Sequence, residues 1–173
     1  MNGFIISAAT NNDRDELSLL YHAVAAVEGG LARTGDEVTE EYIGNFLKKS
    51  LESGVVLVAR QPEMQQIIGE IHAYALGPKV FAHVLGELTI AVHPAHQGRG
   101  IGKALFTELL AEVSRHRPDI SRVELIARES NQKAIALYQK LGFRIEGRLV
   151  GRIRSVGGGF EADIPMAWHR NPA

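Results

Sequence analysis

The chain has 173 residues, 45% of them hydrophobic, and its 19 basic residues nearly balance 20 acidic ones. This composition predicts one globular domain over residues 1–173, with its core at about 4–169, because a chain of this length can bury a single apolar core. The absence of cysteine excludes disulfides and thiolate nucleophiles, and the near-neutral charge gives no reason to expect nucleic acid or an anionic membrane as a partner.

Membrane and export signals are not evident in the sequence. A purely apolar run such as Val55–Ala59 reaches only five residues, whereas a membrane span needs about 18. The apolar stretch Phe4–Ala9 has no basic residue before it, so it does not resemble a signal peptide. We therefore expect a cytoplasmic protein without a membrane partner.

The first quarter of the chain predicts one strand and two helices. Phe4–Ala9 reads as a strand, and a helix follows from about Asp13, with Asn11 or Asn12 as its N-cap. The apolar face of this helix has spacings of three and four residues and consists of Leu17, Leu20, Tyr21, Val24 and Val27. A second amphipathic helix is expected at about Thr39–Glu52, ending before a glycine.

Three consecutive strands are predicted next, at Val55–Arg60, Ile67–Leu76 and Leu85–Val92. In the middle strand the side chains alternate, so Glu70, His72 and Tyr74 share one face and small or apolar residues share the other.

The second half of the chain alternates helices and strands. The expected elements are a helix at about Gly100–His116, a strand at Val123–Ala127, a helix at Asn131–Leu141, and strands at about Arg144–Arg154 and Phe160–Trp168. The fold class is therefore α/β (α+β), with a mixed, mostly antiparallel sheet of about seven strands and helices on both faces.

A glycine-rich loop between the third strand and the following helix carries the clearest functional signal. Glycines there let the backbone turn tightly, and the free N–H groups of the first helical turn make an anion site suited to a pyrophosphate. The P-loop pattern fails, because Ala104 follows Lys103 and no glycine stands at position 97. The dinucleotide fingerprint fails as well, because it needs glycine at position 103 or 105.

The pattern that does fit is Gln97-x-x-Gly100-x-Gly102, placed directly after a strand. It resembles the first motif of the GCN5-related N-acetyltransferase (GNAT) family. Further along the chain, a second segment resembles the second motif of this family. It is Asn131-x-x-Ala134-x-x-Leu137-Tyr138-x-x-x-Gly142-Phe143. The two motifs span residues 87–143. The C-terminal segment is loosely similar to a branch that includes ribosomal-protein N-terminal acetyltransferases.

The resemblance implies that acetyl-CoA lies in a V-shaped opening between the strands Leu85–Val92 and Val123–Ala127. Its pantetheine would pair with the backbone of one of these strands, and Asn131 would contact it. The residues implied to bind the cofactor are Ile90, Ala91, Val92, Gln97, Gly98, Arg99, Gly100, Ile101, Gly102, Lys103, Ala104, Asn131 and Tyr138.

Acetyl transfer to an amine needs a proton acceptor for the ammonium, an oxyanion donor and an acid for the thiolate. Glu87, at the start of the cofactor strand, lies where some family members place a base. Glu70 and a chain of waters are the alternatives. Tyr138 matches the family tyrosine that protonates the sulfur, and the resemblance makes the backbone N–H of Val92 the oxyanion donor. Glu28 and Glu70 are the candidate substrate-binding residues.

The sequence therefore predicts an acetyl-CoA-dependent N-acetyltransferase that acts on a primary amine by direct attack through a tetrahedral intermediate. A catalytically silent CoA-binding module and a dinucleotide-binding protein are the alternatives. No metal is expected, because the pair His93 and His96 flanks a proline and lacks an acidic partner. Family members often form homodimers. The acidic residues before position 50 favour a cationic acceptor, whose identity the sequence does not reveal.

Overall fold

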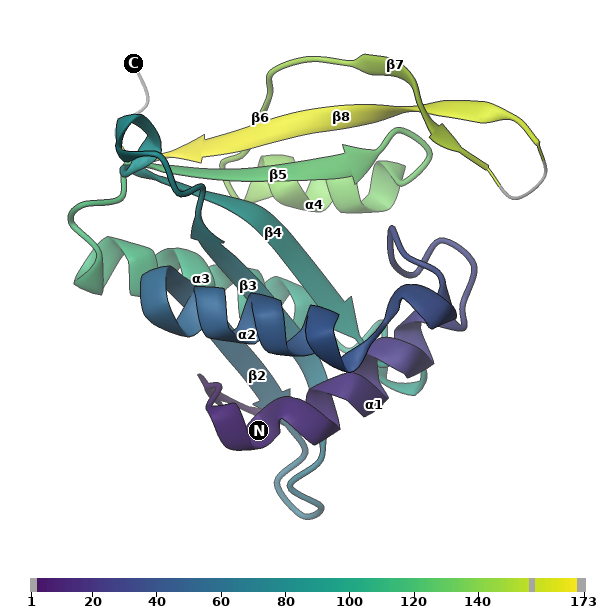
Figure 1. The fold of residues 1–173 in the computed structure, drawn as a ribbon, viewed down its shortest axis with the longest axis vertical. Coiled ribbons are helices and arrows are strands. Elements are labelled where there is room, and N and C mark those ends of the chain that lie inside the picture. The colour runs from purple at the N-terminus through teal and green to yellow at the C-terminus, as the bar shows by residue number, and fades with distance from the viewer. Residues whose placement is uncertain (1–2, 156–157, 171–173) are drawn as a thin grey trace.

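The computed structural model describes residues 3–155 and 158–170, which form a single sheet with helices packed against it (Figure 1). The strands are β1 (Ile5–Ala8), β2 (Gly54–Arg60), β3 (Ile67–Ala75), β4 (Val84–Val92), β5 (Arg122–Arg128), β6 (Arg144–Ile145), β7 (Leu149–Arg154) and β8 (Phe160–His169). The helices are α1 (Arg14–Ala25), α2 (Glu40–Ser53), α3 (Ile101–His116) and α4 (Gln132–Lys140). In the described ranges, no helix has both the length and the apolarity needed to cross a membrane.

The sheet is mixed and mostly antiparallel, as predicted, but it has eight strands instead of about seven. The strand order is β1-β2-β3-β4-β5-β8-β6, and β7 also pairs with β8. All pairs are antiparallel except that of β4 with β5. This single parallel pair lies in the middle of the sheet.

Two apolar cores lie on opposite faces of the sheet. Helices α1 and α2 cover one face, and α3 and α4 cover the other (Figure 1). Strand β2 is buried on both faces, since Val56 and Val58 belong to the core under α1 and α2, and Leu57 belongs to the core under α3. The sheet is therefore a middle layer, which explains why β2 reads as a continuous apolar run.

Helix α1 begins differently from the prediction, because neither Asn11 nor Asn12 is the N-cap. A short 3₁₀ turn at Asn11–Asp13 precedes the helix, and Thr10 is its N-cap, with its N–H donating to Asp13 Oδ2 at 2.7 Å. Val27 is not part of the apolar face either. The helix ends at Ala25, which leaves Val27 46% exposed.

The strand expected at Arg144–Arg154 is interrupted, which accounts for the additional strand. Ile145 pairs with Met166 and Leu149 pairs with Asp163, so this segment has one more residue than the opposite stretch of β8. Glu146 still donates its N–H to the Pro165 carbonyl at 2.9 Å, so the extra residue lies between Glu146 and Leu149. The chain therefore forms β6 and β7 with a bulge between them.

The Asp13 carboxylate fastens the start of α1 to the end of β2. It forms an ion pair with Arg60, and the Arg60 side chain is only 19% exposed. We expect Asp13→Asn to lower the free energy of unfolding by about 1–3 kcal/mol, because a partly buried arginine loses a charged partner. Urea denaturation measures this change.

The control for this prediction is Lys48→Ala. The Lys48–Glu52 pair is 4.0 Å apart and well exposed, so its loss is expected to change stability by less than about 0.5 kcal/mol. Equal losses of unfolding free energy in the two variants would show that the Asp13–Arg60 pair stabilises the fold no more than an exposed ion pair does.

Candidate functional site

Strands β4 and β5 separate after a short paired stretch. They pair only where Val84 and Leu85 lie beside Arg122 and Val123, and they then diverge (Figure 1). The expected opening between the two strands is therefore present.

A bulge in β4 causes this separation. His72 of β3 lies opposite Thr89 and Tyr74 lies opposite Gly86, so β4 has one extra residue in this interval. Glu87 lies in the interval with a φ of 53°, a left-handed conformation that is rare for a residue other than glycine. A bulge bends its strand and increases its twist. The far half of β4 consequently follows β3 and leaves β5.

The residues predicted to pair with a cofactor lie on the free side of β4. Ile90, Ala91 and Val92 pair with β3 through Ile71, Glu70 and Gly69. Within the described ranges, no strand pairs with their other side. This backbone edge can therefore hydrogen-bond to an extended ligand in the manner of an added strand.

The glycine-rich loop leads from this edge to the N-terminus of α3. Gly98 and Gly100 have φ values of 77° and 81°, in the region that favours glycine, and Gly100 is the N-cap. Gln97 is tied back to the strand by a bond from its Nε2 to the Val92 carbonyl, 3.2 Å long.

The first turn of α3 has free donors for an anion. No side chain caps it and it has no acidic residue, whereas Thr39 caps α2 and Asn131 caps α4. The side chains of Arg99 and Lys103 line a separate cavity of about 410 Å³ beside β1. Positive charge therefore lies next to the uncapped helix start, which suits a phosphate group.

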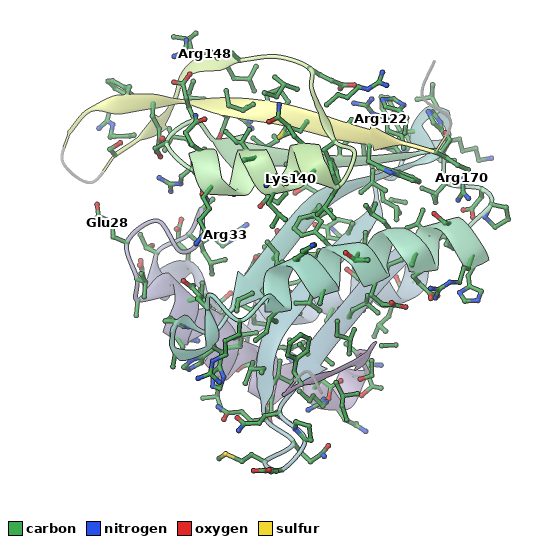
Figure 2. The ribbon with its side chains drawn as sticks, turned by 180° about the vertical axis from the view of Figure 1, so that it is seen from behind. Glu28, Arg33, Arg122, Lys140, Arg148 and Arg170 are labelled. Carbon is green, nitrogen blue, oxygen red and sulfur yellow. The ribbon has the colours of Figure 1, made fainter. Side chains whose placement is uncertain are left out.

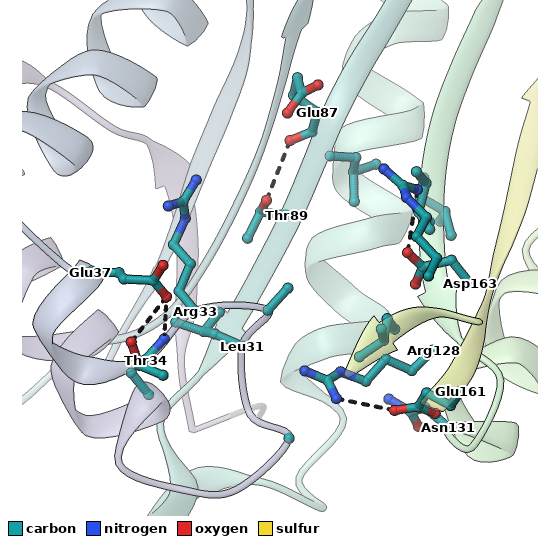
Figure 3. Close-up of a pocket in the computed structure, with 18 of the residues that line it drawn as sticks. Leu31, Arg33, Thr34, Glu37, Glu87, Thr89, Arg128, Asn131, Glu161 and Asp163 are labelled. Atoms are coloured by element: carbon teal, nitrogen blue, oxygen red, sulfur yellow. Dashed lines mark hydrogen bonds and ion pairs between the residues drawn. The ribbon is translucent and has the colours of Figure 1, made fainter. Parts of the chain in front are cut away.

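A cavity of about 1340 Å³ lies on the other side of the opening, between the α1–α2 loop, β3, β4, β5 and the β7–β8 hairpin (Figure 3). Three of the predicted residues line it, namely Glu28, Glu87 and Asn131. Neither Glu70, Tyr138 nor the loop 97–104 contributes to its wall. The structure thus separates the predicted site into the glycine-rich loop, the free edge of β4 at Ile90–Val92, the cavity, and Glu70 and Tyr138 outside the cavity wall.

Charge in the cavity is partly neutralised by ion pairs. Arg128 pairs with Glu161 at 3.1 Å, and Arg152 pairs with Asp163 at 3.3 Å. In the part of the chain that the structure describes, Glu28 and Glu87 form no ion pair. The same holds in these ranges for Glu37, Arg33 and Arg154, so the unpaired side chains of the cavity include three carboxylates and two guanidinium groups.

Glu87 itself is exposed to the cavity because the bulge turns this part of β4 outward. Its carbonyl accepts a hydrogen bond from Thr89 Oγ1 at 3.3 Å (Figure 3). Burial raises the pKa of the Tyr74 phenol, and the nearby charge of Glu87 raises it further. The Glu87 carboxylate therefore lies near the Tyr74 phenol of the adjacent strand, at the wall of the cavity.

Glu70 lies behind the cavity wall. It is fully buried and accepts hydrogen bonds from Tyr21 at 2.6 Å and from His72 Nδ1 at 3.0 Å. Burial, together with the charge of Glu70, raises the pKa of the Tyr21 phenol well above its ordinary value. Glu70 can reach a substrate only through His72, which does line the cavity.

The two predicted residues of α4 have different surroundings. Asn131 lines the cavity, and its Oδ1 accepts a bond from the Ala134 N–H at 3.2 Å, so its side chain also caps the helix. Tyr138 lies two turns further along and packs against Phe106 and Phe143, with ring centroids 4.9 and 6.2 Å away. Burial raises the pKa of its phenol.

Several cavity residues were not singled out from the sequence. Arg33 extends into the cavity from the α1–α2 loop and lies over the Tyr42 ring at 4.0 Å (Figures 2 and 3). A lone arginine in a long loop carries no sequence signal. For His72 a signal was present, since two polar residues alternate in a strand that is otherwise apolar.

Among the described residues, no group of three or more His, Asp or Glu side chains could hold a metal ion. His93 is occupied instead as a cap, because its Nδ1 accepts a hydrogen bond from the Ala95 N–H at 3.2 Å.

Comparison with known proteins places this geometry in a family. The chain is 30% identical over 115 residues to a phosphinothricin N-acetyltransferase of Streptomyces coelicolor, which covers 66% of this chain and 64% of that protein. It is 43% identical over 63 residues to the [ribosomal protein bS18]-alanine N-acetyltransferase of Escherichia coli, covering 35% of this chain and 41% of that protein. The matched segments thus span less than two thirds of these curated relatives.

A solved structure confirms the fold. It is a GNAT superfamily phosphinothricin acetyltransferase from Sinorhizobium meliloti in complex with AcCoA, which superposes with a TM-score of 0.82 at 20% identity and covers 96% of this chain and 88% of that one. The family model described as "Acetyltransferase (GNAT) family" matches residues 27–143, about the interval in which the bulged strand, the glycine-rich loop and α4 lie. The chain therefore belongs to the GNAT acetyltransferase family, a family of acyltransferases.

Proposed function

We propose that the protein is an acetyl-CoA-dependent N-acetyltransferase that transfers an acetyl group to a primary amine. One observation carries this proposal, namely the free edge of β4 at Ile90–Val92 that leads directly to the uncapped start of α3. An extended chain with an anionic end matches both parts, and acetyl-CoA has this form. The family and the AcCoA-bound relative support the same ligand.

The loop residues of the proposed cofactor site act mainly through their backbone. N–H groups between Gln97 and Ala104 would hold the pyrophosphate, with Gly98, Gly100 and Gly102 allowing close approach. The remaining members of this loop, Arg99, Ile101 and Lys103, contribute backbone donors or nearby charge. Asn131, the N-cap of α4, would contact the cofactor from the β5 side of the opening.

The proposed chemistry divides among three groups. When bound, acetyl-CoA supplies the acetyl thioester. Glu87 accepts a proton from the acceptor ammonium, because a protonated amine cannot act as a nucleophile. The Val92 N–H stabilises the oxyanion, and Tyr138 gives a proton to the departing sulfur. Attack is direct, through a tetrahedral intermediate.

The acceptor is proposed to be a cationic primary amine. By their names, the relatives given above act on phosphinothricin and on the alanine of ribosomal protein bS18, so both small molecules and protein amines are candidates. The carboxylates of Glu28 and Glu87 face the cavity without ion pairs in the described part of the chain, which favours an ammonium group. Residues 1–173 are proposed to act as one domain and, as in many relatives, as a homodimer.

The alternative functions give different results in binding and activity assays. A catalytically silent module would bind CoA without acetylating any amine. A dinucleotide-binding protein would prefer NAD.

The first prediction concerns cofactor binding. Acetyl-CoA or CoA at about 100 times its dissociation constant should stabilise the fold by about 2.7 kcal/mol and raise the melting temperature by about 5–10 °C, whereas NAD should not. Thermal unfolding of the purified protein measures the shift. No shift with either CoA species would contradict the cofactor assignment.

Gly102→Ala tests the position of the ligand within this site. A Cβ at Gly102 would lie 3.7 Å from Ile90 Cδ1 and 3.8 Å from Val92 Cγ2, which is ordinary contact. The fold should therefore tolerate the methyl group and gain up to about 1 kcal/mol of helix propensity, while the stabilisation by acetyl-CoA should fall. Gly159→Ala, in the β7–β8 hairpin with nothing within 4 Å, is the control. An undiminished shift in Gly102→Ala would place the ligand elsewhere.

The second prediction separates the proposed base from the proposed acid. Glu87→Gln and Tyr138→Phe should each lower kcat by about 10²-fold or more while the melting shift with CoA is kept. Raising the pH towards the pKa of the amine, near 10, should restore activity to Glu87→Gln but not to Tyr138→Phe, because only the former has lost a proton acceptor. Thiol release from acetyl-CoA is the measurement.

The matched control is Glu63→Gln, since Glu63 is exposed in the β2–β3 turn far from the cavity lining. Loss of CoA binding in either active-site variant would argue for a structural role of that residue.

A further inference from the structure

A buried polar cluster lies in the core between α1, α2 and β3. The Tyr21 hydroxyl donates to Glu70 Oε2 at 2.6 Å, and His72 Nδ1 lies 3.0 Å from Glu70 Oε1. The three residues are 0%, 0% and 2% exposed, respectively for Tyr21, Glu70 and His72. Both oxygens of the carboxylate therefore have a donor, and the three side chains are almost wholly buried.

Filling a core with such a cluster costs free energy. Removing a carboxylate from water costs several kcal/mol even when it is hydrogen-bonded, and apolar side chains of similar volume would stabilise the fold at least as well. Packing alone thus gives no account of Glu70 and His72 at this position.

The second ring nitrogen of His72, Nε2, connects the cluster to the cavity. Nδ1 makes both of the hydrogen bonds that His72 forms in the described residues. Nε2 of His72 therefore has no hydrogen-bond partner in the described residues. It is not fully buried either, because Ser50 Oγ is the only side-chain nitrogen or oxygen there that is both fully buried and unpartnered. Since His72 lines the 1340 Å³ cavity, Nε2 is the atom that opens to the cavity.

Aromatic neighbours hold the imidazole in this orientation. The Phe46 ring stacks on it with a centroid distance of 4.1 Å and an interplanar angle of 7°, and Tyr74 is stacked at 6.0 Å and 8°. The ring cannot rotate without breaking this stack and the bond to Glu70. On the adjacent strand, Thr89 lies opposite His72, and Glu87 faces the same cavity.

We propose that His72, positioned by Glu70 and Tyr21, is a second proton acceptor of the acceptor pocket. Nε2 takes a proton from the bound ammonium, directly or through one water, while Nδ1–H donates to the Glu70 carboxylate. This inference rests on the proposed function and deepens it, because it assigns the group that makes turnover sensitive to pH near neutrality. An imidazole is better matched to this task than an exposed carboxylate, since a general base works best when its pKa is near the working pH.

The protons of the reaction balance with this assignment. Per turnover, an ammonium loses two protons, one C–N bond forms and one C–S bond breaks. One proton ends on the CoA thiol by way of Tyr138. The other must leave before attack: it passes to Glu87 or to His72 Nε2, the two proton acceptors of the pocket, and is released to water after the product departs. Glu70 stabilises the imidazolium in between and keeps its own charge.

Other charged and titratable groups surround the imidazole and share in its titration. From the elements that pack against the ring they are Tyr21 of α1, Tyr42 and Lys49 of α2, Arg33 of the α1–α2 loop, Glu70 and Tyr74 of β3, and Glu87 of β4. The rest of the cavity wall adds Glu28 and Glu37 of the α1–α2 loop, Glu124 and Arg128 of β5, and Arg152, Arg154, Glu161 and Asp163 of the β7–β8 hairpin. Because Glu70 is the carboxylate bonded to the ring, its replacement should have the clearest effect.

The first test reads the tautomer of His72 and does not depend on activity. Long-range nitrogen–proton NMR spectra of histidine-labelled protein, assigned with His72→Gln, should show the neutral ring protonated on Nδ1 only. Protonation on Nε2 instead would overturn the proposal, because that nitrogen would then be a donor unable to accept a proton.

The second test is the pH dependence of kcat/KM with acetyl-CoA and three amines, ethanolamine, L-alanine and the peptide Ala-Ala-Ala. His72→Gln should lower kcat/KM about 10²-fold at pH 7. It should also remove the acid limb of the profile, the fall in kcat/KM as the pH drops below neutrality. Glu70→Gln should keep a limb but move it to lower pH by roughly one unit, since an amide stabilises an imidazolium less than a carboxylate does. Tyr21→Phe should shift the limb less, because His72 keeps its bond to Glu70.

Controls separate a proton acceptor from a structural residue. His22→Gln, on the exposed side of α1, should change neither rate nor profile. A His72→Gln variant that binds CoA normally and keeps the acid limb overturns the proposal, whatever its rate. If the wild-type protein binds acetyl-CoA but acetylates none of the amines, the proposed function fails first and the assignment of His72 falls with it, a result distinct from a fully active His72→Gln variant.

Discussion

The bulge at Glu87 is the feature on which the rest of the site depends. An unbulged β4 would remain beside β5 along its whole length, and the sheet would close. With one extra residue, β4 follows β3 and leaves its other edge unpaired over Ile90–Val92. The same distortion turns the Glu87 carboxylate towards the cavity, at the cost of a left-handed backbone conformation for a residue with a side chain. Strain, cofactor edge and candidate base thus have one common origin.

The two cores explain why this opening does not destabilise the sheet. Strands β2 and β3 are covered on both faces, so the half of the sheet that holds β4 is anchored independently of β5. The other half is held by long pairing between β5 and β8, from Arg122 opposite His169 to Arg128 opposite Asp163. Each half therefore keeps its own hydrogen bonds and apolar cover while the gap between them stays open.

Much of the fold could be predicted from the sequence because the apolar patterns are regular. The helix at Ile101–His116 and the buried strand Gly54–Arg60 were expected within a residue or two. The start of α1 was missed because Thr10 and Asp13 cap a 3₁₀ turn that precedes the helix, and two asparagines between them look like caps. The break between β6 and β7 depends on a register shift against β8, which only the pairing reveals.

The candidate site was less accessible to prediction. Motif spacing placed the loop at Gln97–Ala104 and the helix start at Asn131, since both are local features. Whether Glu70 or His72 meets the cavity depends on side-chain depth in a strand that is buried on both faces, where alternation cannot tell inside from outside. Arg33 enters the cavity from a loop whose path is set by tertiary contacts alone.

The unpaired stretch of β4 also bears on self-association. Free strand edges at the rim of a sheet attract other polypeptides and are a common origin of aggregates. Here the edge is internal. Strand β5 lies across the gap, and α3 packs on the face of β2–β4 that α1 and α2 do not cover. A polypeptide strand carries side chains above and below its own plane and needs room for them on both faces of the sheet. A thin ligand without such side chains needs less room. The width of the gap therefore favours narrow ligands over added polypeptide strands before any chemical recognition takes place.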